Sequence, residues 1–243
     1  MVMIAADNLT KRYDNEALAL DAINFKVKKG EVYCLLGANG AGKTTTINLF
    51  LDFIKPTSGR ALINGIEVAE HPLEAKKYVS YGSDDITLYS HFTARQNLDF
   101  FVKLSGKRGL TKDDYYAVLR EVGLQENAFE KKVQFFSKGM QQKVSIAIAM
   151  IKDAPAILLD EPTSGLDPKA SEELMETLDQ LRCQGKAILI STHDIFRVRE
   201  VADRVGIIKE GRKVLERTRE ELEHEDLQAL YLDYMRNVYR TGR

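Results

Sequence analysis

The feature that most restricts the fold of this chain is a glycine-rich segment, LLGANGAGKTTTINLF, at residues 35–50. Gly37, Gly42, Lys43 and Thr44 fit the pattern G-x-x-x-x-G-K-[ST], with an apolar run before it and a helical pattern after it. Glycines let the backbone wrap around phosphate oxygens, the helix N-terminus faces the anion, and the lysine adds a positive charge. Because a strand and a helix flank it, the segment predicts a nucleoside triphosphate site and not an accidental glycine-rich turn.

The same segment supplies most of the candidate nucleotide ligands. They are Gly37, Asn39, Gly40, Gly42, Lys43, Thr44 and Thr45. Lys43 is also a candidate catalytic residue, and the hydroxyl of Thr44 is a candidate magnesium ligand.

Short apolar runs alternate with helical patterns along the chain, and this alternation indicates the fold class. We expect strands at residues 22–27, 32–37, 60–65, 156–160, 187–191 and 205–211, and helices over about 94–154. Strands that alternate with helices favour an α/β fold with a largely parallel sheet.

Two carboxylates follow the apolar strand predicted at 156–160, in AILLDEPTSGLDP. We expect Asp160 to hold magnesium through its coordination water, and Glu161 to orient and deprotonate the water that attacks the nucleotide. His193 follows the next predicted strand, in AILISTHD, where it would donate a hydrogen bond to the γ-phosphate or to that water. The alternatives are a solvated carboxylate pair and a histidine that is satisfied by backbone groups.

The segment FFSKGMQQKVSIAIAM, at residues 135–150, starts a further helix without containing any nucleophile, base or metal ligand. Ser137 suits the N-cap of this helix. The predicted apolar face consists of Met140, Val144, Ala147, Ile148 and Ile151. Ser137, Lys138 and the Gly139 backbone would form a second anion site at the helix N-terminus. Since the chain already has a phosphate loop, we expect this second site to bind a nucleotide that another subunit holds.

Four segments together carry a resemblance to a known family: GANGAGKT, FSKGMQQKV, ILLDEPTSGLD and STHD. In this order and at these separations they resemble the ATP-binding-cassette (ABC) ATPases, over roughly residues 3–214. The resemblance implies a P-loop ABC-type nucleotide-binding domain, with a mixed or parallel sheet core, an antiparallel β subdomain and a helical subdomain at about 85–155. It places the domain at 1–215 and leaves 216–243 as a C-terminal tail.

The resemblance also implies an assembly and ligands. It implies a head-to-tail dimer with ATP and Mg²⁺ held between the phosphate loop of one subunit and the signature segment, 136–140, of the other. The loop at 164–167 would cross the dimer interface, and Tyr13 would stack on adenine. The two subunits would be copies of this chain or paired ABC ATPases.

Two departures from the family pattern are visible. The usual signature Leu-Ser-Gly-Gly-Gln is replaced by residues 136–140, FSKGM, a form that resembles ATPases paired with ABC-2-type permeases, many of them exporters. The glutamine of the family's magnesium-contacting loop falls on Asp84, or on Asp85 if the register slips. We expect Asp84 to act as a metal ligand, and two solvated loop carboxylates are the alternative.

The partner is expected to be an integral membrane permease. The chain has no apolar run near the ~18 residues that cross a bilayer, and no evident export signal. In the family, the region of Ile86, Leu88, Tyr89, His91 and Phe92 receives a short helix of the membrane subunit. Packing inside the helical subdomain would explain the same residues. Because the expected partner is a membrane permease and no apolar run of the chain is long enough to cross a bilayer, we expect the chain at the cytoplasmic face of a membrane.

Composition and motifs bear on the alternative functions. With 35 Lys and Arg against 36 Asp and Glu, charge gives no reason to expect nucleic acid as a partner. Two cysteines without metal-binding spacing indicate a reducing compartment. TKDD at 111–114 matches a guanine-reading motif by letters but begins a predicted helix. A soluble ABC ATPase that acts on a ribosome or DNA is the main alternative to an exporter subunit.

The last residues read as a helical tail. Thr218 and Glu221 have capping-box spacing, and Leu227, Leu230, Tyr231, Tyr234 and Val238 recur at helical spacing. We expect this tail to pack on its own domain, and a role in dimer contact is the alternative.

Overall fold

The computed structural model describes residues 1–14, 16–83 and 88–236. The candidate metal ligand Asp84, its alternative Asp85, Ile86 of the docking region and Val238 of the tail lie outside these residues. Within them, no helix is long and apolar enough to cross a bilayer.

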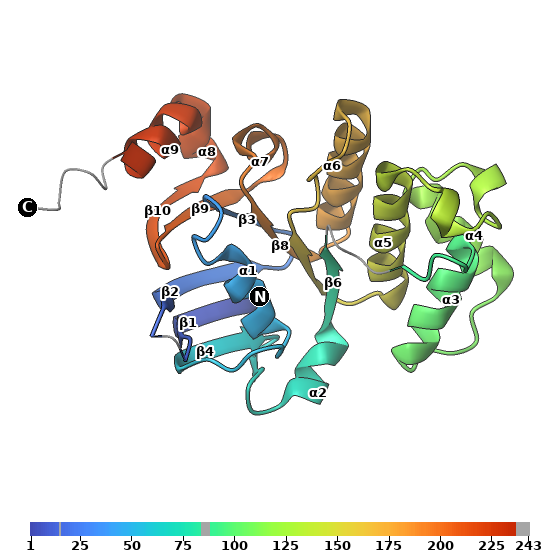
Figure 1. Ribbon diagram of the computed structural model, residues 1–243, viewed down its shortest axis with the longest axis horizontal. Helices are drawn as coiled ribbons and strands as arrows, with labels where there is room; N and C mark the ends of the chain where they lie inside the picture. The colour runs from blue at the N-terminus through green and yellow to red at the C-terminus, as the bar shows by residue number, and fades with distance from the viewer. Residues whose placement is uncertain (15, 84–87, 237–243) are drawn as a thin grey trace, which may run out of the picture.

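A six-stranded sheet forms the centre of the molecule (Figure 1). Its strands, in spatial order, are β10 (Arg212–Thr218), β9 (Arg204–Lys209), β3 (Val32–Leu36), β8 (Ala187–Thr192), β7 (Ala156–Asp160) and β6 (Val79–Ser83). All neighbours pair in parallel except β10, which is antiparallel to β9. Every residue of β3, β7 and β8 is buried, as is typical of parallel strands covered on both faces. The parallel α/β prediction is confirmed.

A second sheet, which is antiparallel, lies beside the first in Figure 1. Its order is β2 (Leu18–Lys28), β1 (Val2–Arg12), β4 (Ser58–Ile63) and β5 (Ile66–Glu67). Alternate residues of β3 face two different cores. Tyr33 and Leu35 pack with residues of the antiparallel sheet and of helix α1 (Lys43–Phe50), whereas Cys34 and Leu36 pack with helices on the other face.

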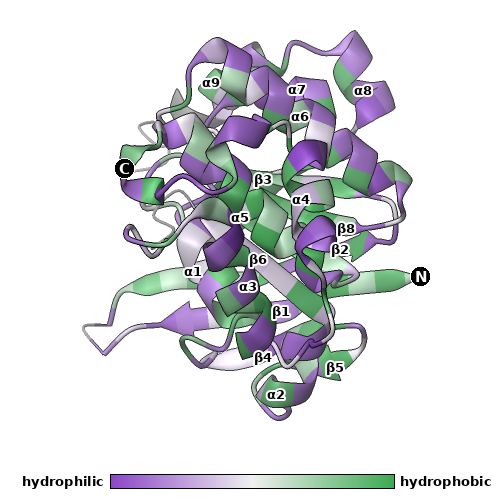
Figure 2. Ribbon diagram, turned by 90° about the vertical axis from the view of Figure 1, so that its right-hand side faces the viewer, coloured by the Kyte–Doolittle hydropathy of each residue, from purple (hydrophilic) through white to green (hydrophobic). Residues whose placement is uncertain are grey.

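The helices surround the larger sheet (Figure 1). They are α2 (Pro72–Ala75), α3 (Ala94–Leu104), α4 (Lys112–Glu121), α5 (Lys138–Lys152), α6 (Pro168–Cys183), α7 (Ile195–Val201), α8 (Arg219–His224) and α9 (Leu227–Arg236). Short 3₁₀ turns cover Lys76–Tyr78, Glu126–Ala128 and Val133–Phe135. Helices α3, α4 and α5 gather at one end of the molecule, opposite α8 and α9. Figure 2 shows mainly apolar strands in the middle and polar residues on the surrounding helices.

Local signals set several helix starts. Thr111 caps α4 and shares a capping box with Asp114, so the TKDD letters serve a helix N-terminus. Thr218 and Glu221 form the predicted capping box of α8. Leu227 of the tail is fully buried, while Tyr231 packs against the core that Leu227 joins.

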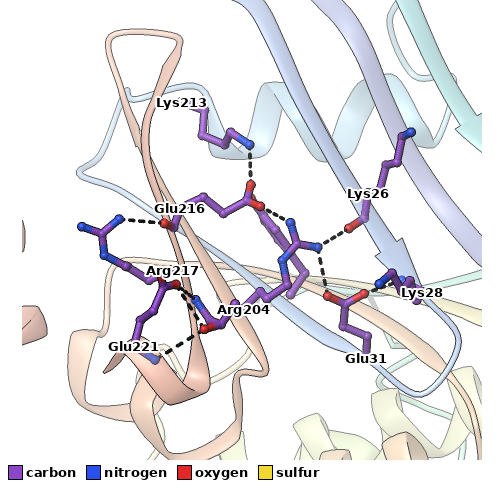
Figure 3. Close-up of polar contacts among 10 residues, drawn as sticks. Lys26, Lys28, Glu31, Arg204, Lys213, Glu216, Arg217 and Glu221 are labelled. Carbon is purple, nitrogen blue, oxygen red and sulfur yellow. Dashed lines mark hydrogen bonds and ion pairs between the residues drawn. The ribbon is translucent and has the colours of Figure 1, made fainter. Parts of the chain in front are cut away.

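An ion-pair network joins the edge of the large sheet to β2 (Figure 3). Arg204 binds Glu31 at 3.0 Å and also pairs with Glu216, which accepts a hydrogen bond from the hydroxyl of buried Tyr33 at 3.1 Å. Burial raises the pKa of Tyr33 well above its usual value, and the charge of Glu216 adds to this. Burial also disfavours the Glu216 carboxylate, but hydrogen bonds from Lys213 and Arg204 lower its pKa overall.

We expect Arg204→Met to lower the free energy of unfolding at pH 7 by about 2 kcal/mol, because Glu31 and Glu216 each lose one charged partner, although Lys213 still pairs with Glu216. Since the folded-state pKa of Glu216 lies below its usual 4.5, its pairing stabilises the fold above that pH and is lost on further acidification. The difference between wild type and variant should therefore shrink below about pH 4.5. Urea unfolding at pH 7 and pH 4 measures both, and Arg212→Met, at an exposed pair, is the control. A pH-independent difference would contradict this account.

Candidate functional site: the carboxyl edge of the parallel sheet

The glycine-rich segment connects β3 to α1 and bends around the side chain of Lys43. Lys43 is buried, and its Nζ donates to the carbonyls of Gly37 at 2.8 Å and Ala38 at 3.2 Å. Gly42 begins α1 with φ 111, a conformation that only glycine adopts easily, and it offers no side chain to cap the helix. The first N–H groups of α1 are therefore left for an anion.

The remaining candidate ligands of the segment lie at its surface. Asn39, Gly40 and Thr44 are exposed, and Thr45 is half-buried. Thr44 lies in the first turn of α1, next to Lys43.

Tyr13 lies beside the start of α1. Its hydroxyl is 3.4 Å from Thr45 Oγ1, and Lys11 Nζ is 5.3 Å from its ring centroid. The tyrosine is partly exposed, so a ring face near the phosphate loop can stack on a nucleobase.

The carboxylate pair lies at the end of β7. Asp160 is buried and accepts a short hydrogen bond from Ser191 of the neighbouring strand β8. Glu161 has φ 49, a left-handed backbone conformation that is strained for glutamate. Its N–H donates to Ser191 O at 2.9 Å, which fixes it against β8.

The structure brings the three candidate catalytic residues together. Glu161 Oε1 lies 3.1 Å from Lys43 Nζ, and Glu161 Oε2 lies 2.8 Å from His193 Nδ1. Because β3, β7 and β8 run in parallel, the residues that follow them meet at one edge of the sheet. Glu161 is only 21% exposed, so these contacts are partly shielded from water.

The candidate second anion site lies elsewhere on the fold. Ser137 caps α5, and its Oγ accepts a hydrogen bond from Met140 N at 3.3 Å. The hydroxyl proton of an accepting serine stays available to a ligand. Helix α5 packs on α3, α4 and β6, whereas α1 packs on β7 and β8. Figure 1 accordingly shows α5 away from the phosphate loop.

The predicted apolar face of α5 is confirmed by burial. Val144, Ala147 and Ile151 are buried, and Met140 and Ile148 pack partly buried against the same core.

The candidate magnesium ligands that the structure describes are Thr44 and Asp160. Both offer oxygen atoms, which magnesium prefers: Thr44 lies in the first turn of α1, and Asp160 ends β7, the strand that α1 contacts. The residues present therefore fit Mg²⁺ held by few protein oxygens together with phosphate oxygens and water.

Two neighbours of the site were not predicted from the sequence. Ser191 orients Asp160, and the signal available was the polar pair Ser-Thr at the end of an apolar strand, AILIST. Tyr231 of α9 is the other: burial raises its pKa, and the charge of Glu161 adds to this. No pattern in the tail sequence predicts that Tyr231 lies near Glu161, because this proximity depends on tertiary packing.

Of the predicted docking residues that the structure describes, some are buried and some are exposed. Leu88 is buried, whereas Tyr89 and Phe92 are partly exposed, with ring centroids 5.2 Å apart. Tyr89 also packs edge-on against Phe100 of α3, so these rings belong to the helical packing as well as to the surface.

Comparisons with known proteins agree with this geometry. The pattern of the family described as ABC transporter matches residues 20–164. The chain is 34% identical to the linearmycin resistance ATP-binding protein LnrL of Bacillus subtilis, over 90% of this chain and 70% of that protein. It is 33% identical to the lantibiotic transport ATP-binding protein SrtF of Streptococcus pyogenes, over 88% and 90%.

Solved structures match over nearly the whole chain. An ATP-binding subunit of an ABC transporter superposes with a TM-score of 0.84 at 30% identity, covering 96% of this chain and all of that one. A dimeric ATP-binding cassette, MJ0796, in a post-hydrolysis state with ADP and phosphate, gives 0.81 at 28% identity, covering 89% and 99%. The phosphate loop, the carboxylate at its lysine and these matches lead to one conclusion: the chain belongs to the ABC transporter family, as an ATP-binding subunit that hydrolyses ATP to ADP and phosphate.

Proposed function

We propose that this chain drives export through a separate integral membrane permease of the ABC-2 type, at the cytoplasmic face of the membrane. Support comes from similar proteins that are named for linearmycin resistance, lantibiotic transport and Nod factor export. The FSKGM signature and the GLDP segment are in keeping with this subclass.

The working unit in this proposal is a head-to-tail dimer of two copies or two paired ATPases. The observation that carries it is that the exposed N-terminus of α5 and the Lys43–Glu161 pair lie in different parts of the fold (Figure 1). Each copy therefore carries a phosphate loop in one part of the fold and the proposed second anion site, Ser137, Lys138 and Gly139, in another. Two copies in opposite orientation would bring each loop to the other's cap, and the similar cassette MJ0796 is described as a dimer.

Hydrolysis follows from the placement of the side chains. The N–H groups of α1 and the ammonium of Lys43 bind the phosphates, and Tyr13 stacks on the base. Thr44 and Asp160 would hold Mg²⁺, which would supply positive charge beside the phosphates when bound. Glu161 takes the proton of the attacking water, and His193, bonded to Glu161, holds that carboxylate in place.

A groove between the large sheet and the helical part is the proposed permease site. It has a volume of about 730 Å³ and lies between α2, β6, α3 and α5. Leu73 and Leu104 line it and are 80% and 73% exposed, beside Tyr81 and Phe101. Its lysines are Lys76, Lys77, Lys107 and Lys152. An apolar rim with basic side chains complements an amphipathic helical segment that carries carboxylates. We assign this segment to the permease.

We expect Leu104→Glu to reduce recovery of the permease with the affinity-tagged chain from detergent-solubilised host membranes by at least fivefold. The added carboxylate removes an apolar contact and repels the acidic segment. Mass spectrometry of the eluate measures this recovery, and Leu232→Glu, at an exposed leucine of α9, is the control. ATPase activity of the purified variant should stay within twofold of wild type.

Two outcomes would contradict the proposal. Equal permease recovery with Leu104→Glu would exclude the groove as the docking site. Fractionation of the wild-type chain with ribosomes or DNA, and with no membrane protein, would favour the soluble alternative.

A further inference from the structure

The first turns of α5 and α6 lie against each other, although α5 belongs to the helical part and α6 follows the catalytic strand β7. A Cβ atom at Gly139 would be 3.1 Å from the Ala170 Cβ, so the two backbones approach closely there. One turn further along, Lys143 Nζ and Glu173 Oε2 form an ion pair at 2.7 Å. The N-terminal end of α5 is therefore held to the beginning of α6.

Lys138 adds a contact that reaches beyond α6 to the loop before it. A Cβ atom at Gly165 would lie 2.8 Å from Lys138 Nζ, 3.1 Å from Cδ and 3.3 Å from Cε. The lysine side chain thus lies along the Gly165 turn, where φ is +68. Methylene groups packed on backbone fix a position without needing a charge.

The Gly165 turn is directly connected to the general base. Ser164 N donates to the carbonyl of Glu161 at 3.1 Å, and Leu166 N donates to the carbonyl of Thr163 at 3.2 Å. Glu161 itself begins this turn in a left-handed conformation, with φ 49. A strained residue keeps its geometry only while its surroundings hold it, so a shift of the turn would move the Glu161 carboxylate.

We propose that Lys138 is a positioning residue for Glu161 of its own subunit: its side chain couples the nucleotide-binding cap of α5, through the Gly165 turn, to the general base. The inference rests on the proposed head-to-tail dimer, in which each nucleotide lies between the phosphate loop of one subunit and the N-terminus of α5 of the other. Within one subunit, Lys138 would link the α5 N-terminus, which binds one nucleotide, to the Glu161 carboxylate, which acts on the other. Both nucleotide sites of the proposed dimer would then reach their active geometry together. A glycine at position 138, as in the usual family signature, has no side chain with which to make this contact.

The test separates the methylene stem of Lys138 from its charge. For Lys138→Ala we expect kcat to fall about tenfold because the general base is displaced, while KM for ATP should be the same as in Lys138→Met, since both variants lose the charge that the second anion site would offer to a nucleotide. Lys138→Met keeps a long apolar stem and should restore kcat to within threefold of wild type. Steady-state phosphate release at varied Mg-ATP measures both constants. Lys169→Ala removes an exposed lysine from the first turn of α6 and is the control.

Other results would overturn the inference. A wild-type kcat for Lys138→Ala would show that the contact with Gly165 does not position Glu161. A raised KM with unchanged kcat in both Lys138 variants would instead assign the residue to nucleotide binding by its charge. ATP-dependent dimerisation of Lys138→Ala combined with Glu161→Gln should persist, so a failure of the coupling is distinguishable from a failure of the proposed dimer.

Discussion

Replacing Glu161 by glutamine is expected to lower the turnover number for ATP by at least about 100-fold, within the range that general-base catalysis supplies. Glutamine has nearly the same shape but cannot accept the proton of the attacking water. Nucleotide binding should survive, because Lys43 keeps its bonds to the loop carbonyls when its pairing with the Glu161 carboxylate is weakened. Phosphate release at saturating Mg-ATP measures the loss.

The same variant tests the dimer. Slow hydrolysis should trap two subunits around ATP, so light scattering should report a dimer with Mg-ATP and a monomer without it. Glu200→Gln changes a carboxylate on α7 that pairs with Arg197, and it should behave as wild type in both assays. Turnover within a few-fold of wild type would remove Glu161 from the role of base, and a monomer under saturating ATP would contradict the proposed head-to-tail dimer.

Gly42→Ala is expected to weaken ATP binding by more than 100-fold. A Cβ atom at this position would lie 2.6 Å from the Ala19 carbonyl oxygen and 2.7 Å from Leu20 Cδ2, and φ is +111. Backbone strain and overlap together cost on the order of 3 kcal/mol, which must be relieved by moving the loop away from the phosphates. Titration calorimetry with a non-hydrolysable ATP analogue measures the affinity.

Gly40→Ala is the matched control for this loop. Gly40 also has positive φ, +79, but no atom lies within 4 Å of the Cβ that alanine would add. Strain alone costs about 1 kcal/mol, so its affinity should fall by roughly tenfold at most. Equal losses in the two variants would show that φ, and not close packing against Ala19 and Leu20, decides the outcome. Thermal unfolding without nucleotide would identify a variant that simply fails to fold.

Much of the candidate site could be predicted from the sequence, because the residues that would carry out the chemistry lie in short contiguous segments. The phosphate loop, the DE pair after an apolar strand and the histidine after another each appear with their flanking elements. Parallel strands then bring these segments to one edge without further information. The roles of Tyr13, Ser137 and Gly139 in nucleotide binding stay predictions, and Asp84 lies outside the described residues.

The remaining features depend on contacts between distant parts of the chain. Strands β1, β5, β6 and β10 were not predicted. In β1 and β10, DNLTKR and ERT look like surface loops until their neighbours pair with them. The order of strands is likewise non-local: Asp203 accepts a hydrogen bond from Val32 N across 171 residues. The contact of Lys138 with Gly165 arises where α5 meets α6, and no periodicity in either helix encodes it.

The left-handed backbone at Glu161 means that the proposed general base lowers the stability of the protein. At φ 49 a glycine would be accommodated without steric penalty, whereas glutamate is held there at about 1 to 2 kcal/mol. Thermal stability alone would therefore favour glycine at this position. If Glu161 is replaced by glycine, the fold should become more stable while the proposed proton acceptor is lost, so this position exchanges some thermal stability for turnover.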